Sequence, residues 1–286
     1  MKVLLVSSED PASLNIRDRL LEETDWEDVG RFENSEVFVH EELLIYQKKG
    51  THLFFENVDR EITLHMREEL QGIVAGDVIE GPEVIAFLSR HRSEMDVRSL
   101  TVHPPGNFLQ ADFGGEAGRV PLSAPFHMTA ALKALYREKK ALDLKDQTTY
   151  EVTHHGPYLS RPSFFIEIGS DPGRWGIPDL GRSIARALLS VDFNNPDRDL
   201  PIAIGIGGGH YAPRFTDRAM RNKYAFGHMI PDYILLRESD VRDLVEMALS
   251  STPGAQHAFI HRSKANEKKL AGIDEILDDM GLKAVH

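Results

Sequence analysis

Short apolar runs alternate with longer segments of helical spacing along most of the chain. Strand-like runs occupy residues 2–7, 37–39, 43–46, 52–55, 82–89, 148–153, 163–168, 201–206 and 258–261. Apolar residues three or four positions apart, the spacing of one helix face, occur in residues 11–23, 125–142, 180–191, 239–250 and 267–280. Strands that alternate with helices predict an α/β fold with a mixed, largely parallel sheet flanked by helices.

Length and composition fit a single α/β catalytic domain over residues 1–286, with residues 22–81 as a candidate small lobe. The apolar content of 41% is ordinary for a globular protein. No run approaches the roughly 20 apolar residues of a membrane span, and the apolar run near the N-terminus is too short for a signal peptide. We therefore expect a cytoplasmic protein without a membrane partner, as a monomer or a small homo-oligomer.

Six of the thirteen histidines stand in short turns, most of them beside a strand-like run. They are His91 in SRHRS, His103 in TVHPPGN, His154 and His155 in THHGP, His210 in GIGGGHYAP, and His228 in AFGHMIP. Imidazole binds transition metals and moves protons near neutral pH, and strand ends of α/β proteins are where sites form. The chain has no cysteine, so any transition metal must be held by His, Asp or Glu. The pattern predicts a metal-capable cleft built from distant segments.

The pair His154 and His155 stands where Gly156 and Pro157 end a strand. Neighbouring residues of a strand face opposite sides, but the end of the strand makes this divergence only partial. One interpretation is a metal ligand, His154, followed by a proton carrier, His155. The alternative is a pair that caps a turn by bonding backbone groups.

Glu167 interrupts an otherwise apolar strand in PSFFIEIGS. Burying an unpaired carboxylate costs several kcal/mol, so Glu167 must meet a metal, a cation or several donors. A structural salt bridge to an arginine remains the alternative. His/His/Glu sets are common for catalytic zinc, which makes Glu167 the preferred carboxylate and Glu151 a weaker candidate.

The glycine-rich turn GIGGGHYAP begins like a dinucleotide fingerprint, but His210 stands where the last glycine belongs. No acidic residue ends a second strand about twenty positions later, so NAD binding is rejected. Gly207, Gly208 and Gly209 are expected to bring backbone N–H groups to a phosphate or an oxyanion, with Tyr211 beside the substrate.

The formal net charge of −12 argues against broad DNA binding. It leaves room for an RNA substrate held by a local basic patch, and Arg214, Arg218 and Arg221 after the glycine turn are the first candidates. A second patch comprises Arg90, Arg92 and Arg98. Solvated surface arginines are the alternative interpretation of either patch.

In chain order, SRHRS, TVHPPGN, THHGP, PSFFIEIGS, GIGGGHYAP and AFGHMIP resemble the archaeal-type D-aminoacyl-tRNA deacylase family, as do MKVLLVSSEDPASLNI and VDREI. The resemblance spans nearly the whole chain, and residues 22–50 and 107–119 match less clearly. It implies hydrolysis of the ester that joins a D-amino acid such as D-tyrosine to tRNA. It also implies a zinc requirement and an α/β fold related to the phosphorylase/peptidyl-tRNA hydrolase group.

The family's motifs carry over onto His91, His103, His154, His155, Glu167, His210 and His228, but not their individual roles. We expect Zn²⁺ ligands among His154, Glu167, His210 and His228, and catalytic roles for His155, His91 and His103. The Gly207–Gly209 turn, Tyr211 and the three arginines Arg214, Arg218 and Arg221 are expected to bind substrate. Two alternatives remain, namely a zinc carboxypeptidase-like or amidase enzyme on a small substrate, and a non-enzymatic metal- or RNA-binding module.

Overall fold

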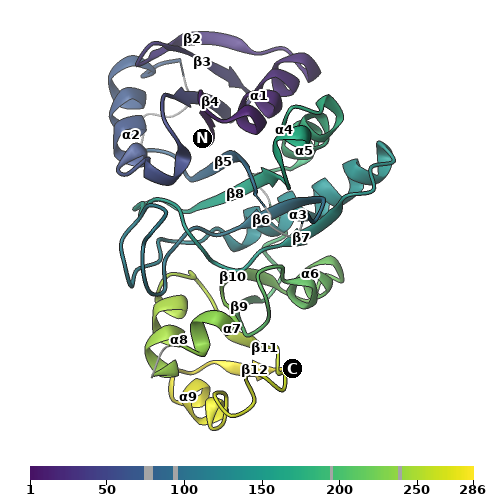
Figure 1. The fold of residues 1–286 in the computed structure, drawn as a ribbon. Helices are drawn as coiled ribbons and strands as arrows, with labels where there is room; N and C mark the ends of the chain where they lie inside the picture. Colours follow the sequence, from purple (N-terminus) through teal and green to yellow (C-terminus); the bar gives the residue numbers. More distant parts are fainter. Residues whose placement is uncertain (74–79, 93–95, 194–195, 238–239) are drawn as a thin grey trace.

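The computed structural model describes residues 1–73, 80–92, 96–193, 196–237 and 240–286. Within these ranges the strands form an eight-stranded sheet, ordered β2-β3-β4-β1-β5-β8-β6-β7, and a four-stranded sheet, ordered β10-β9-β11-β12 (Figure 1). The strands are β1 (Lys2–Ser7), β2 (Glu27–Phe32), β3 (Ser35–His40), β4 (Leu43–Lys48), β5 (Val84–Arg90), β6 (Ser99–His103), β7 (Gln147–Tyr150), β8 (Ser163–Ile168), β9 (Ile202–Ile206), β10 (Ala225–Ile230), β11 (His257–Ile260) and β12 (Lys283–Val285).

The helices cover both faces of the larger sheet, which confirms the predicted mixed α/β fold. They are α1 (Pro11–Glu23), α2 (Val58–Glu69), α3 (Pro125–Ala141), α4 (Pro172–Trp175), α5 (Pro178–Ser190), α6 (Pro213–Met220), α7 (Asp232–Leu235), α8 (Val241–Ser250) and α9 (Ile273–Asp279), with a 3₁₀ turn at His52–Phe54. No helix in the described ranges combines the length and the apolar character needed to cross a bilayer.

Alternation along β1 divides the core of the larger sheet into two layers. Leu4 and Val6 pack in the cluster that contains residues of α1, α3 and α5, whereas Val3 and Leu5 pack with residues of α2 on the other face. In the centre of the sheet β4, β1, β5 and β8 run parallel, and β6 and β7 run the opposite way. This direction change brings the starts and ends of strands together beside β8.

The smaller sheet is parallel throughout and joins the larger one through the chain that follows β7. The N–H of Val152 donates to the carbonyl of His210 (3.0 Å), and that of Thr153 donates to Met229 (3.0 Å). One face of this sheet packs on α8 and α9, and its other face continues the core of the larger sheet. The segment 151–153 therefore forms a seam between the two sheets.

Several predicted elements match the structure, and others end elsewhere. Strands 2–7 and 163–168 and helix 11–23 are confirmed at both ends. The expected strand at 52–55 is wrong: this stretch is a 3₁₀ turn, because buried His52 turns inward and donates from Nε2 to Leu5 O (3.1 Å).

The expected strands 37–39 and 43–46 are longer in the structure, at Ser35–His40 and Leu43–Lys48, whereas two other spans are shorter. The run 148–153 leaves the sheet after Tyr150, and the helix at 267–280 reduces to Ile273–Asp279 after Gly272, which has a φ of 76°. Ser239, predicted to start a helix, lies outside the described residues. Within the candidate lobe, β2–β4 extend the edge of the larger sheet, and the division into domains stays a prediction.

Candidate metal and hydrolysis site

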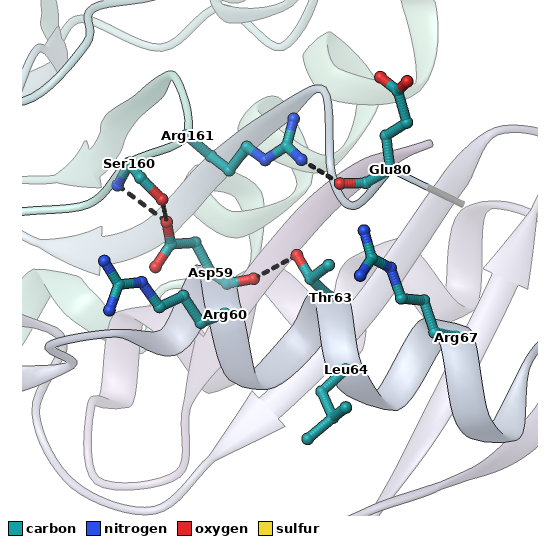
Figure 2. Close-up of a pocket in the computed structure, with 8 residues that line it drawn as sticks. All are labelled: Asp59, Arg60, Thr63, Leu64, Arg67, Glu80, Ser160 and Arg161. Carbon is teal, nitrogen blue, oxygen red and sulfur yellow. Dashed lines mark hydrogen bonds between the residues drawn. The ribbon is translucent and has the colours of Figure 1, made fainter. Parts of the chain in front are cut away.

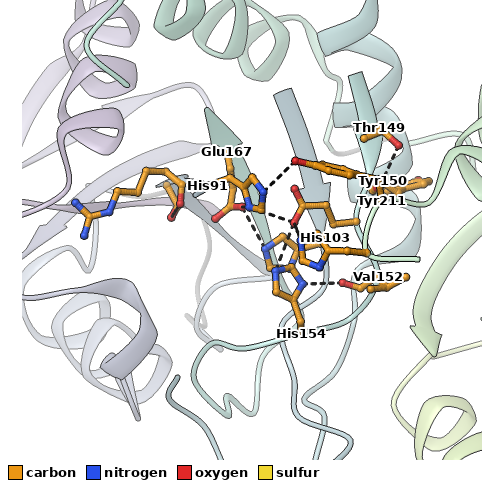
Figure 3. Close-up of polar contacts among 12 residues, drawn as sticks. His91, His103, Thr149, Tyr150, Val152, His154, Glu167 and Tyr211 are labelled. Carbon is orange, nitrogen blue, oxygen red and sulfur yellow. Dashed lines mark hydrogen bonds and ion pairs between the residues drawn. The ribbon is translucent and has the colours of Figure 1, made fainter. Parts of the chain in front are cut away.

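The predicted histidine turns converge where the two sheets meet. His91 follows β5, His103 ends β6, Glu151 follows β7 and His210 follows β9, while Glu167 lies within β8. Figure 3 shows His91, His103, His154 and Glu167 directed toward one another. The site is therefore assembled from strand ends that are up to 120 positions apart along the chain, as the contact between His91 and Tyr211 illustrates.

Glu151 is the centre of this cluster. Its Oε2 lies 3.0 Å from His210 Nε2, 3.4 Å from His154 Nε2 and 3.5 Å from His91 Nδ1. The side chain is fully buried, and neither oxygen accepts a well-formed hydrogen bond from a described residue. These four side chains place their ligand atoms within 4.8 Å of one another.

Glu167 forms the second carboxylate of the site. Its Oε2 lies 3.5 Å from His103 Nε2 and 3.7 Å from His91 Nδ1, and the residue faces Thr101 across the β6–β8 ladder. Glu167 is also fully buried with both oxygens unpaired, and no arginine of the described residues forms an ion pair with it. The alternative of an arginine salt bridge is therefore not what the structure contains.

Backbone contacts fix the orientation of the imidazoles. His154 Nδ1 donates to Val152 O at 2.8 Å, so that Nε2 faces Glu151 without its proton. For His91 it is the backbone that is held. Its backbone N–H donates to Ile168 O (2.9 Å), and its backbone carbonyl accepts from Trp175 Nε1 (3.1 Å). A ligating histidine usually donates its other ring N–H to a carbonyl as His154 does, which sets the tautomer and the ring angle.

The electrostatics distinguish the buried carboxylate of Glu151 from the imidazoles of His154 and His155. Burial acts to raise the pKa of Glu151, but contact with His210 and the charges of His91 and His103 outweigh it and hold that pKa well below its usual range. Burial, with the neighbouring imidazoles, lowers the pKa of His154 and of His155 well below 6.5. The site thus holds a buried anion, Glu151, beside two histidines, His154 and His155, that stay neutral at pH 7.

His103 differs from these two histidines. Burial acts to lower its pKa, but contact with Glu167 and the charges of both carboxylates outweigh this, so that the pKa of His103 is raised. Its ring stacks on Phe165, with 5.0 Å between the ring centroids, and its Nδ1 contacts Pro104 O at 3.2 Å. These contacts direct Nε2 of His103 toward Glu167.

The unpaired atoms of the site match the needs of a divalent cation. Both oxygens of Glu151 and Glu167, His103 Nε2 and His155 Nδ1 are buried and lack a hydrogen-bond partner in the described part of the chain. Leaving such groups unpaired costs about 1–3 kcal/mol each, and more for a charge. Nitrogen and carboxylate donors at this spacing suit zinc, so the residues fit the ion that the sequence predicted.

His228 does not join the cluster, and its predicted role as a ligand is not supported. It lies inside β10, fully buried, and both ring nitrogens already have partners: Nδ1 contacts Thr153 Oγ1 (3.0 Å) and Nε2 donates to Pro121 O (2.7 Å). Its imidazole instead holds the backbone next to His154. Glu151, expected only as a weaker candidate, takes the central place, and its position three residues before His154 at the end of a strand is the available signal.

The predicted substrate residues differ in whether their polar groups are already hydrogen-bonded within the protein. Tyr211 hydrogen-bonds to His91 Nε2 through its hydroxyl (3.2 Å). The N–H of Gly207 donates to Ile230 O (2.8 Å), so this one of the three expected glycine donors is already engaged. Gly208 has a φ of 93°, and Gly209 is exposed.

The arginines of α6 are partly committed to protein contacts. Arg218 donates to His286 O (3.3 Å) and lies over the Phe259 ring, and Arg221 pairs with Asp217 (2.7 Å). Arg214, in the first turn, is exposed.

In the second basic patch, Arg90 stacks over Trp175, while Arg92 and Arg98 are exposed. Both patches therefore retain exposed guanidinium groups.

A separate hollow of about 330 Å³ lies beside α2, away from the histidines. Figure 2 shows Arg60, Arg67 and Arg161 around it, with Arg161 donating to the Glu80 carbonyl. The buried carboxylate of Asp59 accepts from Ser160 N (2.8 Å) and is therefore satisfied within the protein. Among its described residues, the hollow lacks the unpaired groups that distinguish the histidine site.

Comparison with known proteins gives a consistent result. The profile of the tRNA deacylase family, described as D-aminoacyl-tRNA deacylase, matches residues 78–285. The D-aminoacyl-tRNA deacylase of Methanosarcina mazei is 33% identical over 99% of this chain and 91% of its own length. That of Pyrococcus furiosus is 32% identical over 100% and 99%. A crystal structure of a conserved protein of unknown function is 27% identical, with a TM-score of 0.82 over 99% of this chain and 94% of that one.

Proposed function

Because the chain belongs to the D-aminoacyl-tRNA deacylase family, we propose that its buried His/Glu cluster hydrolyses the ester bond between a D-amino acid and tRNA. The observation that carries this proposal is the pair of buried, unpaired carboxylates, Glu151 and Glu167, ringed by histidines at the junction of the sheets. The products are free tRNA and a D-amino acid, and D-tyrosyl-tRNA is the substrate with which we propose to test it.

Zinc is the proposed cofactor, and His91, Glu151, His154 and His210 are the residues that would hold it. A bound zinc ion supplies Lewis acidity, which polarises a carbonyl and lowers the pKa of water. Glu167 and His103 would orient the neighbouring ligands, since Glu167 contacts both His91 and His103.

The protein's own groups would manage the protons and the developing charge. His155 is half-buried beside the cluster, its Nδ1 has no partner among the described residues, and its lowered pKa keeps it neutral at pH 7. It would take a proton from the attacking water and return one to the ribose oxygen as the ester breaks. Backbone N–H groups of Gly208 and Gly209 would meet the oxyanion, since that of Gly207 is engaged.

The tRNA acceptor end would be held by the arginines nearest the site. A net charge of −12 repels nucleic acid overall, so productive binding needs a local concentration of positive charge. Arg214, Arg218 and Arg221 follow the glycine turn directly, and we propose them as phosphate contacts, with Arg90, Arg92 and Arg98 next.

The test is release of amino acid from matched D- and L-tyrosyl-tRNA, with and without a chelator. The proposal expects fast release from the D-ester, slow release from the L-ester, and loss of activity in chelator that added zinc restores. Full activity in chelator together with no stoichiometric metal would refute the role of zinc. Chelator-sensitive cleavage of small amides but not of either tRNA would indicate an amidase, and binding without turnover would indicate a non-enzymatic module.

A further inference from the structure

A second group of polar side chains gathers at the carboxyl edge of the smaller sheet, next to the histidine cluster. Asp232 and Tyr233 follow β10, and His261 follows β11. The N–H of Asp232 donates to Gly208 O (2.8 Å), and a Cβ on Gly208 would lie 2.8 Å from His261 Nδ1. Three neighbouring parallel strands, β10, β9 and β11, thus end around the glycine turn that follows β9. The carboxyl ends of parallel strands are where α/β sheets bind ligands.

The carboxylate of Asp232 is held in place by a buried amide. Asn266, fully buried, donates from Nδ2 to Asp232 Oδ1 (2.7 Å) and to His261 O (2.9 Å), and its Oδ1 accepts from Ser263 N (2.8 Å). Asp232 itself remains partly exposed. Two of these bonds fix the amide itself and the third holds the carboxylate of Asp232 at the surface, an arrangement that suits binding of a group outside the protein.

Tyr233 provides an aromatic surface beside this carboxylate. The side chain is 39% exposed, which places it among the more exposed large apolar residues of the described chain. Burial, and after it the charge of Glu151, raises the pKa of the Tyr233 phenol to about 12. An exposed ring next to Asp232, just after β10, can stack on a base of a single-stranded RNA end.

We propose that Tyr233, Asp232 and the Gly208–Gly209 turn bind the 3′-terminal adenosine of the tRNA substrate. Tyr233 stacks on the adenine, and Asp232 accepts a hydrogen bond from the ribose hydroxyl that does not carry the amino acid. Gly209, which is exposed and has open space beside its Cα, lets the sugar approach the turn closely. This inference rests on the proposed function and specifies where the RNA side of the substrate lies.

The chemistry of the ester supports this placement. The scissile bond joins the amino acid directly to the terminal ribose, so the adenosine must lie within one nucleoside's length of the cluster. Gly208 and His210 are two positions apart, a separation of at most about 7 Å along the chain. The adenosine site is therefore close enough to share one substrate with the histidines.

A second exposed aromatic ring lies close in the fold to the histidine pair His154 and His155. Phe113, 61% exposed, lies on the loop whose carbonyl accepts from Gly156 N (3.1 Å). It offers an apolar ring but no carboxylate held by a buried amide among the described residues. Phe113 is accordingly the competing platform that the experiment must exclude.

The experiment compares two small esters that differ only in the base. D-tyrosyl-adenosine carries adenine, and D-tyrosyl-1,4-anhydroribitol carries the same sugar without a base. For the wild-type holoenzyme we expect a kcat/KM about 10- to 100-fold higher for the adenosine ester, the range of one base–aromatic stack. Tyr233→Ala and Tyr233→Leu should reduce this preference to near unity, chiefly through KM. Tyr233→Phe should keep it.

Controls separate the base from the sugar and from the fold. Asp232→Asn should lower kcat/KM for both esters by a similar factor and leave their ratio unchanged. Tyr136→Ala, in α3, should leave the ratio and the rates unchanged, and melting temperatures identify any variant that fails to fold.

A wild-type ratio near one, or a ratio that survives both Tyr233→Ala and Tyr233→Leu in folded protein, would overturn the inference while leaving the deacylase function intact. Collapse of the ratio in Phe113→Ala instead would place the adenosine beside Phe113 and overturn the inference. If the wild-type protein cleaves neither ester nor D-tyrosyl-tRNA, the proposed function itself is wrong, and the adenosine site falls with it.

Discussion

Replacing Glu151 by Gln removes the charge at the centre of the site while keeping its shape. The carboxylate is fully buried and lies within 3.0–3.5 Å of three imidazole nitrogens, those of His210, His154 and His91. Gln has nearly the same volume, so packing around β7 should persist. The variant therefore tests electrostatics and ligation rather than the fold.

The magnitude follows from the proposed role of Glu151 as a direct ligand. Losing a residue that only orients a ligand costs about 10- to 100-fold in metal affinity, so the loss of Glu151 should cost at least about 100-fold, or about 2.7 kcal/mol. Zinc bound as proposed would stabilise the folded protein, and this stabilisation should shrink by the same amount at fixed free zinc. In chelator the variant should be less stable than the wild type, because the lowered pKa of Glu151 means that the folded protein stabilises this charge through the neighbouring histidines.

The assay is thermal unfolding at fixed free zinc and in chelator, combined with turnover of D-tyrosyl-tRNA. Glu36→Gln, an exposed carboxylate on β3, is the matched control and should behave as the wild type in each measurement. The role of Glu151 as a ligand is refuted if Glu151→Gln keeps the zinc-dependent rise in melting temperature and turns over within about twofold of the wild type.

Four further outcomes are expected. Glu167→Gln should lower metal affinity or activity about 10- to 100-fold, and normal metal content and turnover with a lower melting temperature would instead indicate a structural role. Arg218→Ala with Arg221→Ala should raise KM for D-aminoacyl-tRNA and flatten its salt dependence, by about 0.7–0.9 in log–log slope per lost phosphate contact, while sparing D-tyrosyl-adenosine. Burial lowers the pKa of His52 from 6.5 to about 3, so below pH 6.5 the unfolded chain binds a proton that the folded protein does not. The contribution of His52 to the free energy of unfolding should be full above pH 6.5 and fall by up to about 5 kcal/mol toward pH 3. The free energy of unfolding of His52→Asn, measured with urea, should therefore depend less steeply on pH. Gly208→Ala, at a φ of 93° and against His261, should destabilise by about 1–3 kcal/mol, measured as a lower melting temperature.

The regular elements were predictable where local pattern and tertiary environment agree. β1 and β8 are buried along their whole length, so their apolar runs, which only Glu167 interrupts in β8, identify them. The stretch 52–55 has equal apolar character but turns inward around His52, because a buried backbone carbonyl, that of Leu5, accepts its imidazole proton. Periodicity does not encode such a contact, which depends on another strand.

The sequence predicted most of the residues that come together at the site, but not that Glu151 lies at its centre. His210 and His228 look alike in sequence, since each follows a glycine near a strand, yet one lies beyond β9 and the other inside β10 with both nitrogens bonded. A shift of a few residues in where a strand ends decides between a ligand and a structural imidazole. Glu151 gains its importance only from three histidines that approach it in space.

Segment 151–153 hydrogen-bonds to both His210 and Met229, and this affects when, during synthesis of the chain, the site can assemble. The residues before β9 provide His91, Glu151 and His154, and only the later part of the chain provides His210. A nascent chain that has completed the larger sheet therefore holds only three of the four proposed zinc ligands. Hydrolytic competence should appear late in synthesis, when the last strands dock and bring His210 against Glu151.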